Sequence, residues 1–474
     1  MKNYTFKKLK NKINIQREIK ASAVYTVSNA ASRILTLFMT PIFTRLLTPS
    51  EYALYPLFLG VSGIFSTLIT LEISSGIIYS GLLKFHGKSE DGFILSAFLS
   101  ELIPAFIFSS IYMIFRHRIN VALGLFGAVI PILIVQVLLN SAINIFISKT
   151  RYRGAHKRAA ITNAAIGFLT APTSLVFIRL GLGGRARIFS LVLITALFAL
   201  PILASFIKKG VRSASLAHFS FIYKKAIPLL PHYLSLALIG GGGRIIIAKM
   251  LGKEALGKYS AANSVGLAVT VIFTAFISAL SPKIAALASR KNEESLSRIF
   301  KTAYKASAFL ILLFLCASRE IFLFASPSEY YSAHGVIFFT SLGALFNFIS
   351  NLAFFSLVSA GKEKRLTKIS LIFALFFIPL TLIMTSGFGY IGTSISEAAL
   401  SFIRMIVTLF LAGKKIRVRY YLSTALLIFP FAYLIYLLDS SPVSRILLAA
   451  ALILSLGFDK KSYLGLFFKS KADA

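Results

Sequence analysis

The feature that most constrains this chain is a series of apolar runs, each about 20 residues long, that recur along its 474 residues. A helix of that length can cross the roughly 30 Å hydrocarbon core of a bilayer. The runs are continuous, unlike the alternating segments of about ten residues that build an outer-membrane barrel. The sequence therefore predicts an all-α polytopic membrane protein, in agreement with a charged fraction of only 14%.

We expect about fourteen transmembrane helices, with termini uncertain by a few residues. They cover roughly residues 21–43, 53–80, 92–115, 119–148, 159–180, 187–207, 227–248, 257–282, 303–325, 334–360, 369–386, 390–412, 421–438 and 443–458.

The Lys and Arg residues lie mainly on one side of these spans. With the N-terminus inside, the inner segments hold 37 basic residues and the outer loops hold 11. This positive-inside pattern predicts that both termini are cytoplasmic in a bacterial inner membrane. The net charge of +35 could suggest a nucleic-acid partner, but the charges sit in short loops between apolar runs, so we expect none.

The ends of the chain and its single cysteine exclude several other classes. Residues 1–20 form a basic tail with interleaved apolar residues, which predicts contact with membrane lipids. The first apolar segment is too long for a signal-peptide core, so we expect it to remain in the mature protein. Cys316 alone supports neither a disulfide framework nor a cysteine metal site, and the six His residues are isolated. No cofactor is expected.

Polar residues in the first span follow a helical rhythm. The spacings are four, three, four, three and four residues, and the positions are Ser22, Thr26, Asn29, Arg33, Thr36 and Thr40. This rhythm places all of them on one face of a helix. Because an arginine is costly to hold in lipid, the face should point to a wet or protein-lined interior. The sequence therefore predicts a transporter whose first helix lines the path.

The chain also repeats itself. RLLTPSEYALY, at residues 45–55, aligns with KMLGKEALGKY, at residues 249–259, at an offset of 204. GLGG at 181–184 lies near GFGY at 387–390 at an offset of 206, and a third pair of loop glycines is 207 residues apart. Similar pairs at nearly one offset predict two homologous six-helix lobes that enter the membrane in the same direction.

The predicted organisation follows from the spans and the repeat. It comprises a cytoplasmic tail at 1–20, an N-lobe at 21–207, a cytoplasmic linker at 208–226, a C-lobe at 227–412, two added helices within 421–458 and a cytoplasmic tail at 459–474.

Several of these segments carry a family resemblance. The segment at 45–55 resembles the "LLxPxEYGxYxL" segment of the polysaccharide-export, O-antigen-type flippases of the multidrug/oligosaccharidyl-lipid/polysaccharide (MOP) exporter superfamily. TLEISSGIIYS at 70–80, IPLLPHYLSLALI at 227–239, ALSPKIAAL at 279–287 and GFGYIGTSISEA at 387–398 are also similar to that family. One departure is Gly243, which stands where the family often has an Asp before the arginine of span seven.

The resemblance implies a V-shaped, two-lobed carrier rather than an enzyme. Such a carrier would move an undecaprenyl-diphosphate-linked oligosaccharide from the inner to the outer leaflet by alternating access. A polysaccharide polymerase and a chain-length protein are further partners of this kind of export.

Two arginines inside spans are candidate contacts for a diphosphate. The guanidinium of Arg33 could form bidentate hydrogen bonds with phosphate oxygens, or it could form a structural ion pair with Glu72 or Glu101. Arg244 follows the glycine run 240–243, which either admits a helix or ligand closely or marks a flexible break in the helix.

Span twelve has a polar face of its own. Its residues recur at helical spacing and comprise Ser394, Glu397, Ser401, Arg404 and Thr408. This face either lines a cavity or is satisfied by another helix.

The intramembrane acids Glu72, Glu101 and Glu397 could couple transport to an ion or proton, or pair with the arginines. The amides Gln136, Asn140, Asn144, Asn347 and Asn351 are more typical of hydrogen bonds that join helices.

Two other functions compete with the flippase. A cation-coupled multidrug exporter of the MATE type would need acids in its cavity, and the basic character of this chain counts against it. A membrane-embedded glycan polymerase or ligase would carry a large outer loop, whereas the outer loops predicted here are short. No phosphate-cradling loop with Lys and Ser/Thr indicates direct use of ATP.

Overall fold

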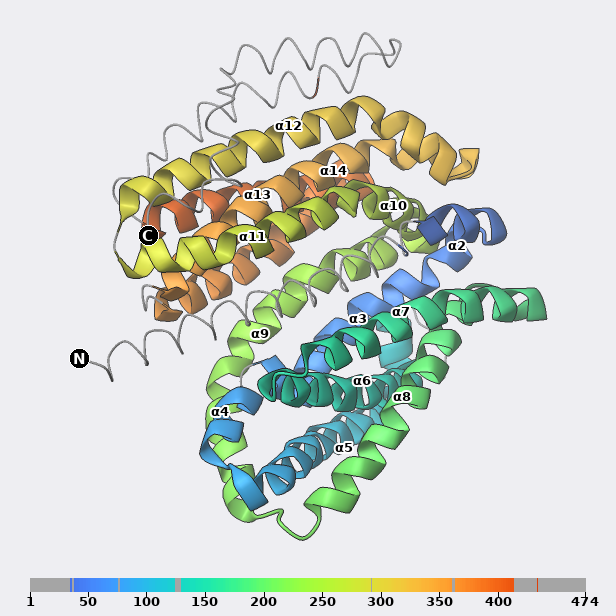
Figure 1. The fold of residues 1–474 in the computed structure, drawn as a ribbon. Helices are drawn as coiled ribbons and strands as arrows, with labels where there is room; N and C mark the ends of the chain where they lie inside the picture. The colour runs from blue at the N-terminus through green and yellow to red at the C-terminus, as the bar shows by residue number, and fades with distance from the viewer. Residues whose placement is uncertain are drawn as a thin grey trace. The chain divides into compact units, whose positions relative to one another are not determined.

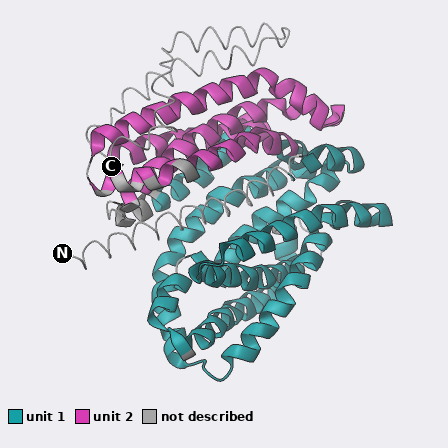
Figure 2. Cartoon of the chain, in the orientation of Figure 1, with its two compact units in different colours: residues 1–260, 370–386 teal, residues 261–369, 387–474 magenta. Residues whose placement is uncertain are grey.

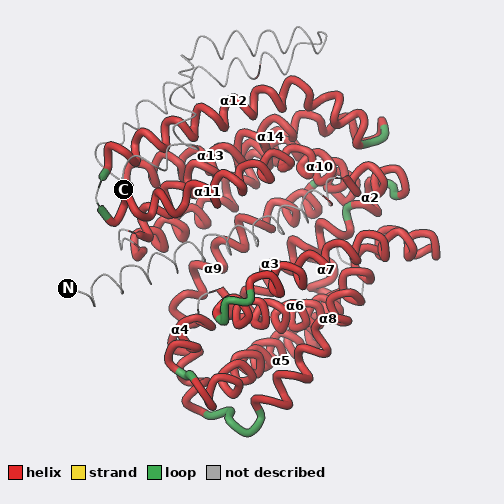
Figure 3. The backbone as a smooth tube through the Cα atoms, in the orientation of Figure 1, coloured by secondary structure: helices red, strands yellow, loops and turns green. Residues whose placement is uncertain are grey.

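The computed structural model describes residues 38–75, 77–123, 129–290, 292–359 and 363–412, together with Leu35 and Tyr433. Within these ranges the chain is helical and contains no strand (Figure 3), which confirms the all-α prediction. Several sequence predictions lie outside the described residues: the tail 1–20, Thr26, Asn29, Arg33 and Thr36 of the first span, the last two spans and the tail 459–474.

The helices follow one another with short connections (Figure 1). They are α2 (Pro49–Tyr52), α3 (Leu54–Thr70), α4 (Ile77–Lys84), α5 (Glu90–Leu123), α6 (Val129–Tyr152), α7 (His156–Phe177), α8 (Ala186–Gly210), α9 (Leu216–Met250), α10 (Gly252–Gly266), α11 (Thr270–Ser289), α12 (Glu293–Ala325), α13 (His334–Ser359) and α14 (Glu363–Ala412).

Nine segments of the described residues are long and apolar enough to cross a membrane. Seven of them match one expected span each. The segments His156–Gly210 and Ser370–Ala412 each contain two expected spans, joined at a glycine with positive φ. Expected spans two to twelve therefore all have a helical counterpart, while the full number of fourteen stays a prediction.

The second expected span, 53–80, is broken where the sequence predicted a continuous helix. α3 ends at Thr70, and Leu71 and Glu72 take left-handed conformations with φ of 49° and 51°. The Thr70 hydroxyl accepts a hydrogen bond from the Glu72 amide, at 3.3 Å, and the Ser75 amide donates to the Glu72 carbonyl. These local bonds replace the helical ones, which allows the helix to end without a glycine or proline.

The boundary between expected spans three and four also differs from the prediction. Helical residues continue to Leu123, through Arg116 and Arg118, which were expected in a loop. The backbone nevertheless leaves the helical conformation at Phe115, with φ −109° and ψ 20°, so the expected end of span three coincides with a kink and a further helical stretch follows it.

The described chain divides into two compact units (Figure 2). The first contains Met1–Ser260 and Ser370–Ser386, and the second contains Ala261–Ile369 and Gly387–Ala474. The lobes expected at 21–207 and 227–412 stay a prediction.

Two helix interruptions lie at the aligned GLGG and GFGY segments. Gly183 has φ 53° and ψ −139°, and Gly389, 206 residues later, has φ 58° and ψ −148°. Only glycine adopts this region readily, because a Cβ atom would clash with the backbone. Matching rare conformations at one sequence offset are what a duplicated helix reversal would produce.

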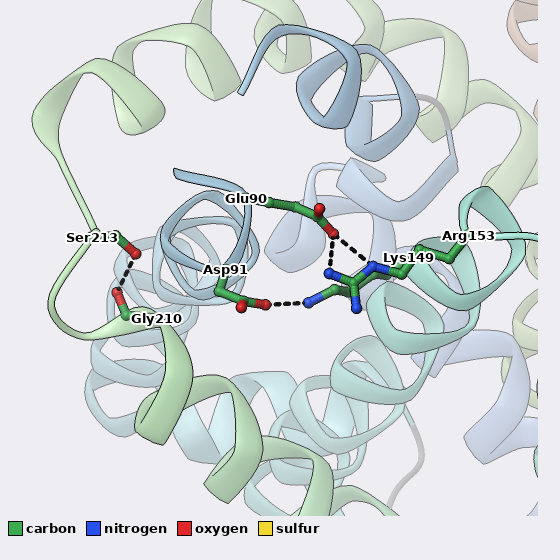
Figure 4. Close-up of polar contacts among 6 residues, drawn as sticks. All are labelled: Glu90, Asp91, Lys149, Arg153, Gly210 and Ser213. Carbon is green, nitrogen blue, oxygen red and sulfur yellow. Dashed lines mark hydrogen bonds and ion pairs between the residues drawn. The ribbon is translucent and has the colours of Figure 1, made fainter. Parts of the chain in front are cut away.

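In the first unit, α5, α6, α8 and α9 meet near the start of α5. Lys149 donates to Asp91 at 2.5 Å and Arg153 contacts Glu90 at 2.8 Å, joining the last turn of α6 to the first turn of α5 (Figure 4). The α8–α9 loop packs closely beside them, because Gly92 lies directly against the Ser213 carbonyl. These charges therefore hold helix ends together.

The core of the second unit is formed by α11, α12, α13 and the last part of α14. It contains stacked rings such as Phe273 and Phe348, whose centroids lie 4.8 Å apart, and the buried Cys316. α12 begins at Asn292, whose side chain accepts a hydrogen bond from the Ser295 amide and so caps the helix.

Candidate functional site

The glycine run of α9 is the contact point between α9 and α3 in the first unit. A Cβ atom added to Gly241 would lie 2.5 Å from the Gly60 carbonyl oxygen. α9 is continuous through residues 240–243, so the run admits a neighbouring helix and does not break its own. Phe377 of α14 approaches the next glycine, Gly242, in the same way.

Arg244 lies one turn beyond this crossing. Its Cβ and Cδ atoms pack against Gly60, and its side chain is half-buried. It makes no hydrogen bond or ion pair with the residues that the structure describes. A guanidinium held in a span without a counter-charge is available to bind an anion.

A second arginine of the first unit was missed by the sequence analysis. Arg187, in the first turn of α8, is 8% exposed, and its guanidinium lies over the rings of Phe43, Tyr52 and Tyr55. Arg187 and Arg244 both lie close enough to the Tyr55 hydroxyl for their charges to act on it. In the sequence, Arg187 stands at the first position of the expected span 187–207 and was counted with the basic residues of the preceding loop. The Tyr52–Tyr55 spacing nevertheless placed two aromatic rings on one face.

Two acids of the first unit that were expected inside spans, Glu72 and Glu101, lie close enough to interact electrostatically. Glu101 is fully buried, its Oε1 atom accepts a hydrogen bond from Ser141 at 2.7 Å, and its Oε2 atom has no partner among the described residues. Glu72, at the α3–α4 break, accepts a hydrogen bond from Ser75 at 2.5 Å. Neither carboxylate has an ion pair in the described part of the chain, and the expected partner, Arg33, lies outside it.

The amides of α6 differ in their surroundings. Gln136 donates to Thr195 of α8 at 3.1 Å, which is the helix-joining role expected for it. Asn140 and Asn144, one and two turns later, are exposed. Of the polar face predicted for the first span, only Thr40 is described, and it is buried.

The polar groups of α14 in the second unit pack against α13. Arg404 donates to the Asn347 side-chain oxygen, and Thr408 donates to Ser350 at 3.3 Å. Glu397 has an interaction partner, Ser401 is half-buried, and Ser394 is buried and donates to its own helix at Ile391. The structure thus brings Arg404 and Thr408 together with α13.

The second unit also holds an apolar cavity of about 470 Å³. It is lined by Phe338, Phe339, Leu342, Phe346, Ile395, Ala398, Ala399, Phe402 and Tyr433. A cavity with this lining suits a hydrocarbon rather than a polar ligand. Among the described residues, no group of three or more His, Cys, Asp or Glu side chains is placed to hold a metal ion.

Solved structures show where this fold occurs. The chain is similar to a structure described as the lipid II flippase MurJ in an inward closed conformation, with a TM-score of 0.70 and 16% identity, over 91% of this chain and 97% of that one. It is also similar to an inward-facing multidrug resistance MATE family transporter of the MOP superfamily, with a TM-score of 0.61 and 16% identity, over 84% and 96% of the two chains. The chain therefore has the MurJ/MATE-like fold of a polytopic helical membrane protein.

Sequence comparison gives the family. No curated protein matches the chain. The model of a family described as "Polysaccharide biosynthesis protein" matches residues 19–288. These residues include α2 to α10, and with them Arg187, Arg244, Glu72 and Glu101. Because the match covers more than half of its length, the chain belongs to the polysaccharide biosynthesis protein family.

Proposed function

We propose that this protein flips an undecaprenyl-diphosphate-linked oligosaccharide from the inner to the outer leaflet of a bacterial cytoplasmic membrane by alternating access. The observation that carries the proposal is Arg244, a half-buried guanidinium without a counter-charge among the described residues of a membrane-crossing helix. The family and the fold shared with a lipid II flippase support this assignment.

The substrate has three chemical parts, and the chain offers a suitable surface for each. A diphosphate needs cationic donors, which Arg244 supplies. Sugar hydroxyls need polar partners, and the exposed amides Asn140 and Asn144 of α6 provide them. A prenyl chain needs apolar surface, which the long apolar helices supply.

The export context completes the proposal. Both termini are cytoplasmic, by the distribution of basic residues. The flipped unit is then passed to a polysaccharide polymerase and a chain-length protein. Arg33, with Thr26, Asn29 and Thr36 on the same face, contributes to the path from the first helix, and Ser401 contributes from span twelve.

The test is a complementation experiment in a strain that lacks the protein. We expect undecaprenyl-linked units to accumulate on the cytoplasmic side, where their sugars can be identified by mass spectrometry. Wild-type protein and Arg244→Lys should restore surface polysaccharide at least in part, whereas Arg244→Ala should not. Lys249→Ala is the matched control, because Lys249 is an exposed basic residue of the same helix. Full surface polysaccharide with a correctly inserted Arg244→Ala protein would contradict the assignment.

A cation-coupled multidrug exporter is the second candidate. It is favoured by Glu101, a fully buried carboxylate without a counter-charge in the described chain, and by the MATE-like fold. The strain experiment separates the two functions, because a drug exporter would change drug sensitivity and leave surface glycans normal. Within the flippase proposal, Glu101, Glu72 and Glu397 are candidates for ion or proton coupling.

A further inference from the structure

The guanidinium of Arg187 lies in a cage of aromatic rings in the first unit. Its central carbon is 4.2 Å from the ring centroid of Tyr55, 4.5 Å from that of Phe43 and 5.1 Å from that of Tyr52. The cage forms because the α7–α8 turn packs on α2, where Gly184 lies directly against the Glu51 carbonyl. This contact brings the first turn of α8 beside the tyrosines.

The rings stabilise the positive charge but leave the N–H donors without acceptors. A ring face attracts the charge of a guanidinium but supplies no hydrogen-bond acceptor of the carbonyl or carboxylate kind for its five N–H groups. The Nη1 atom is buried and has no hydrogen-bond partner, and no described residue forms an ion pair with Arg187. A buried charged donor without an acceptor is costly, so this site is incomplete without a bound group.

The neighbouring polar side chains do not supply the missing acceptor. The carboxylate of Glu51 accepts hydrogen bonds from the amide and hydroxyl of Thr48, at 3.2 and 3.3 Å, and so caps α2. Thr170 and Ser174 of α7 donate their hydroxyls to carbonyls of their own helix, at 2.6 and 2.7 Å. Each hydroxyl oxygen keeps the capacity to accept a hydrogen bond, but neither accepts one from the Arg187 Nη1 atom.

A cavity of about 140 Å³ adjoins the cage. Arg187, Tyr55, Thr170 and Ser174 supply the polar groups of its wall, and the rest of the wall, including Ala171, is apolar. A cavity of about 150 Å³ holds one benzene molecule, so this one has room for a single small group and not for a sugar chain. We infer that the Arg187 cavity binds one oxyanion of the phosphate class, gripped by the in-plane N–H donors of the guanidinium. This inference does not depend on the proposed transport function.

The first experiment measures phosphate binding by the purified full-length protein in detergent. Thermal unfolding is followed while inorganic phosphate replaces a large, weakly binding anion at constant ionic strength. We expect a saturable rise in Tm for wild type and an apparent affinity at least about tenfold weaker for Arg187→Gln, since a charge-assisted two-pronged contact is lost. The matched control is Arg179→Gln, because Arg179 is exposed and makes no interaction with the described residues.

A second variant keeps the test decisive if Arg187→Gln does not fold. Ala171→Leu fills the cavity and leaves the arginine in place, so it should also weaken phosphate binding. A Tm rise of equal size and midpoint in wild type and Ala171→Leu would overturn the inference.

A second arm identifies the source of the anion. Native mass spectrometry compares retention of undecaprenyl monophosphate with that of the uncharged undecaprenol by wild type and Arg187→Gln. Retention of the lipid phosphate that depends on Arg187 supports a head-group site, and a response to inorganic phosphate alone supports a free-anion site. Absence of both responses in wild type overturns the inference, whatever the outcome for Arg244 in the transport test.

Discussion

The two helix reversals at Gly183 and Gly389 share a backbone conformation but carry different side chains. Four residues after Gly183 stands Arg187 in its aromatic cage, and the position 206 residues later holds Thr393, which is buried. A glycine is required at both reversals because the backbone demands it, whereas the side chain four residues on is free to differ. The two turns therefore share a backbone conformation, while a buried cation follows only the first of them.

The arginines inside the spans show the same contrast between the units. Arg244 in the first unit has no partner in the described chain, while Arg404 in the second donates to Asn347. The second unit uses its charge to join α13 and α14, and the first leaves its charge available. An arginine in a span is therefore a candidate binding residue only when no neighbouring side chain forms a hydrogen bond or an ion pair with it.

The largest predicted effect concerns the two reversals. Gly183→Ala is expected to lower the free energy of unfolding by about 2–4 kcal/mol, because it adds to the backbone strain a displacement of the Glu51 carboxylate, which caps α2. The new Cβ atom would lie 2.4 Å from the Glu51 carboxylate. Gly389→Ala should cost only about 1–3 kcal/mol, since it incurs the strain without a neighbour within 4 Å.

The measurement can use the single cysteine. Cys316 is buried and the chain has no Trp, so a thiol-reactive fluorescent dye reports global unfolding on heating. Equal losses for Gly183→Ala and Gly389→Ala would show that the contact with α2 contributes nothing at the first reversal.

The next effect separates binding from stability at the arginines. Arg244→Ala should reduce transport about 10- to 100-fold, the loss of one charge-assisted contact, and change stability by less than about 0.5 kcal/mol. Arg404→Ala should instead lower the free energy of unfolding by about 1.5–3 kcal/mol, because Asn347 loses a charged donor. Transport of oligosaccharide in cells and dye-monitored unfolding of the purified variants check both. The contrast between the units fails if Arg244→Ala is the less stable variant.

A smaller effect tests whether Arg404 joins helices. A double-mutant cycle with Arg404→Ala and Asn347→Ala should give a coupling free energy of about 1–2 kcal/mol. The neutral contact of Gln136 with Thr195 in the first unit provides the comparison, with a coupling of about 0.5–1 kcal/mol expected. A coupling near zero for the charged pair would remove the structural role assigned to it.

The sequence predicted those parts of the fold that depend on local pattern. Spans two to twelve were predictable because an apolar run near 20 residues long is a local property. The aligned glycines at 183 and 389 were predictable because a helix reversal with positive φ at this position admits few residues other than glycine. The break at Leu71 and Glu72 was not predictable, since neither residue favours positive φ and the break depends on nearby Thr and Ser side chains.

The residues of the candidate site also differ in whether a local sequence pattern could predict them. Arg244 was found because it interrupts an apolar run next to a glycine cluster. Arg187 was missed because its cage is assembled from three separate parts of the chain: the helical segment 38–46, the residues from α2 into α3, and the start of α8. No local sequence pattern predicts a contact of that kind. Because Arg187 stands at the start of an expected span, it was interpreted as one of the loop charges that report membrane topology.

The smallest predicted effect compares a close helix–helix contact inside the second unit with one inside the first. Gly343→Ala in α13 should raise the free energy of unfolding by about 0.5–1 kcal/mol, because alanine favours the helix. Its Cβ atom would meet the Ala398 Cα atom at 3.5 Å, an ordinary contact. The same change at Gly241 should cost about 1–3 kcal/mol, because the Gly60 carbonyl leaves no room. Dye-monitored unfolding of both variants gives the sign directly. Destabilisation by Gly343→Ala would mean that the contact of α13 with α14 requires glycine as strictly as the contact of α3 with α9. A close helix approach would then no longer distinguish the first unit, which carries Arg244, from the second.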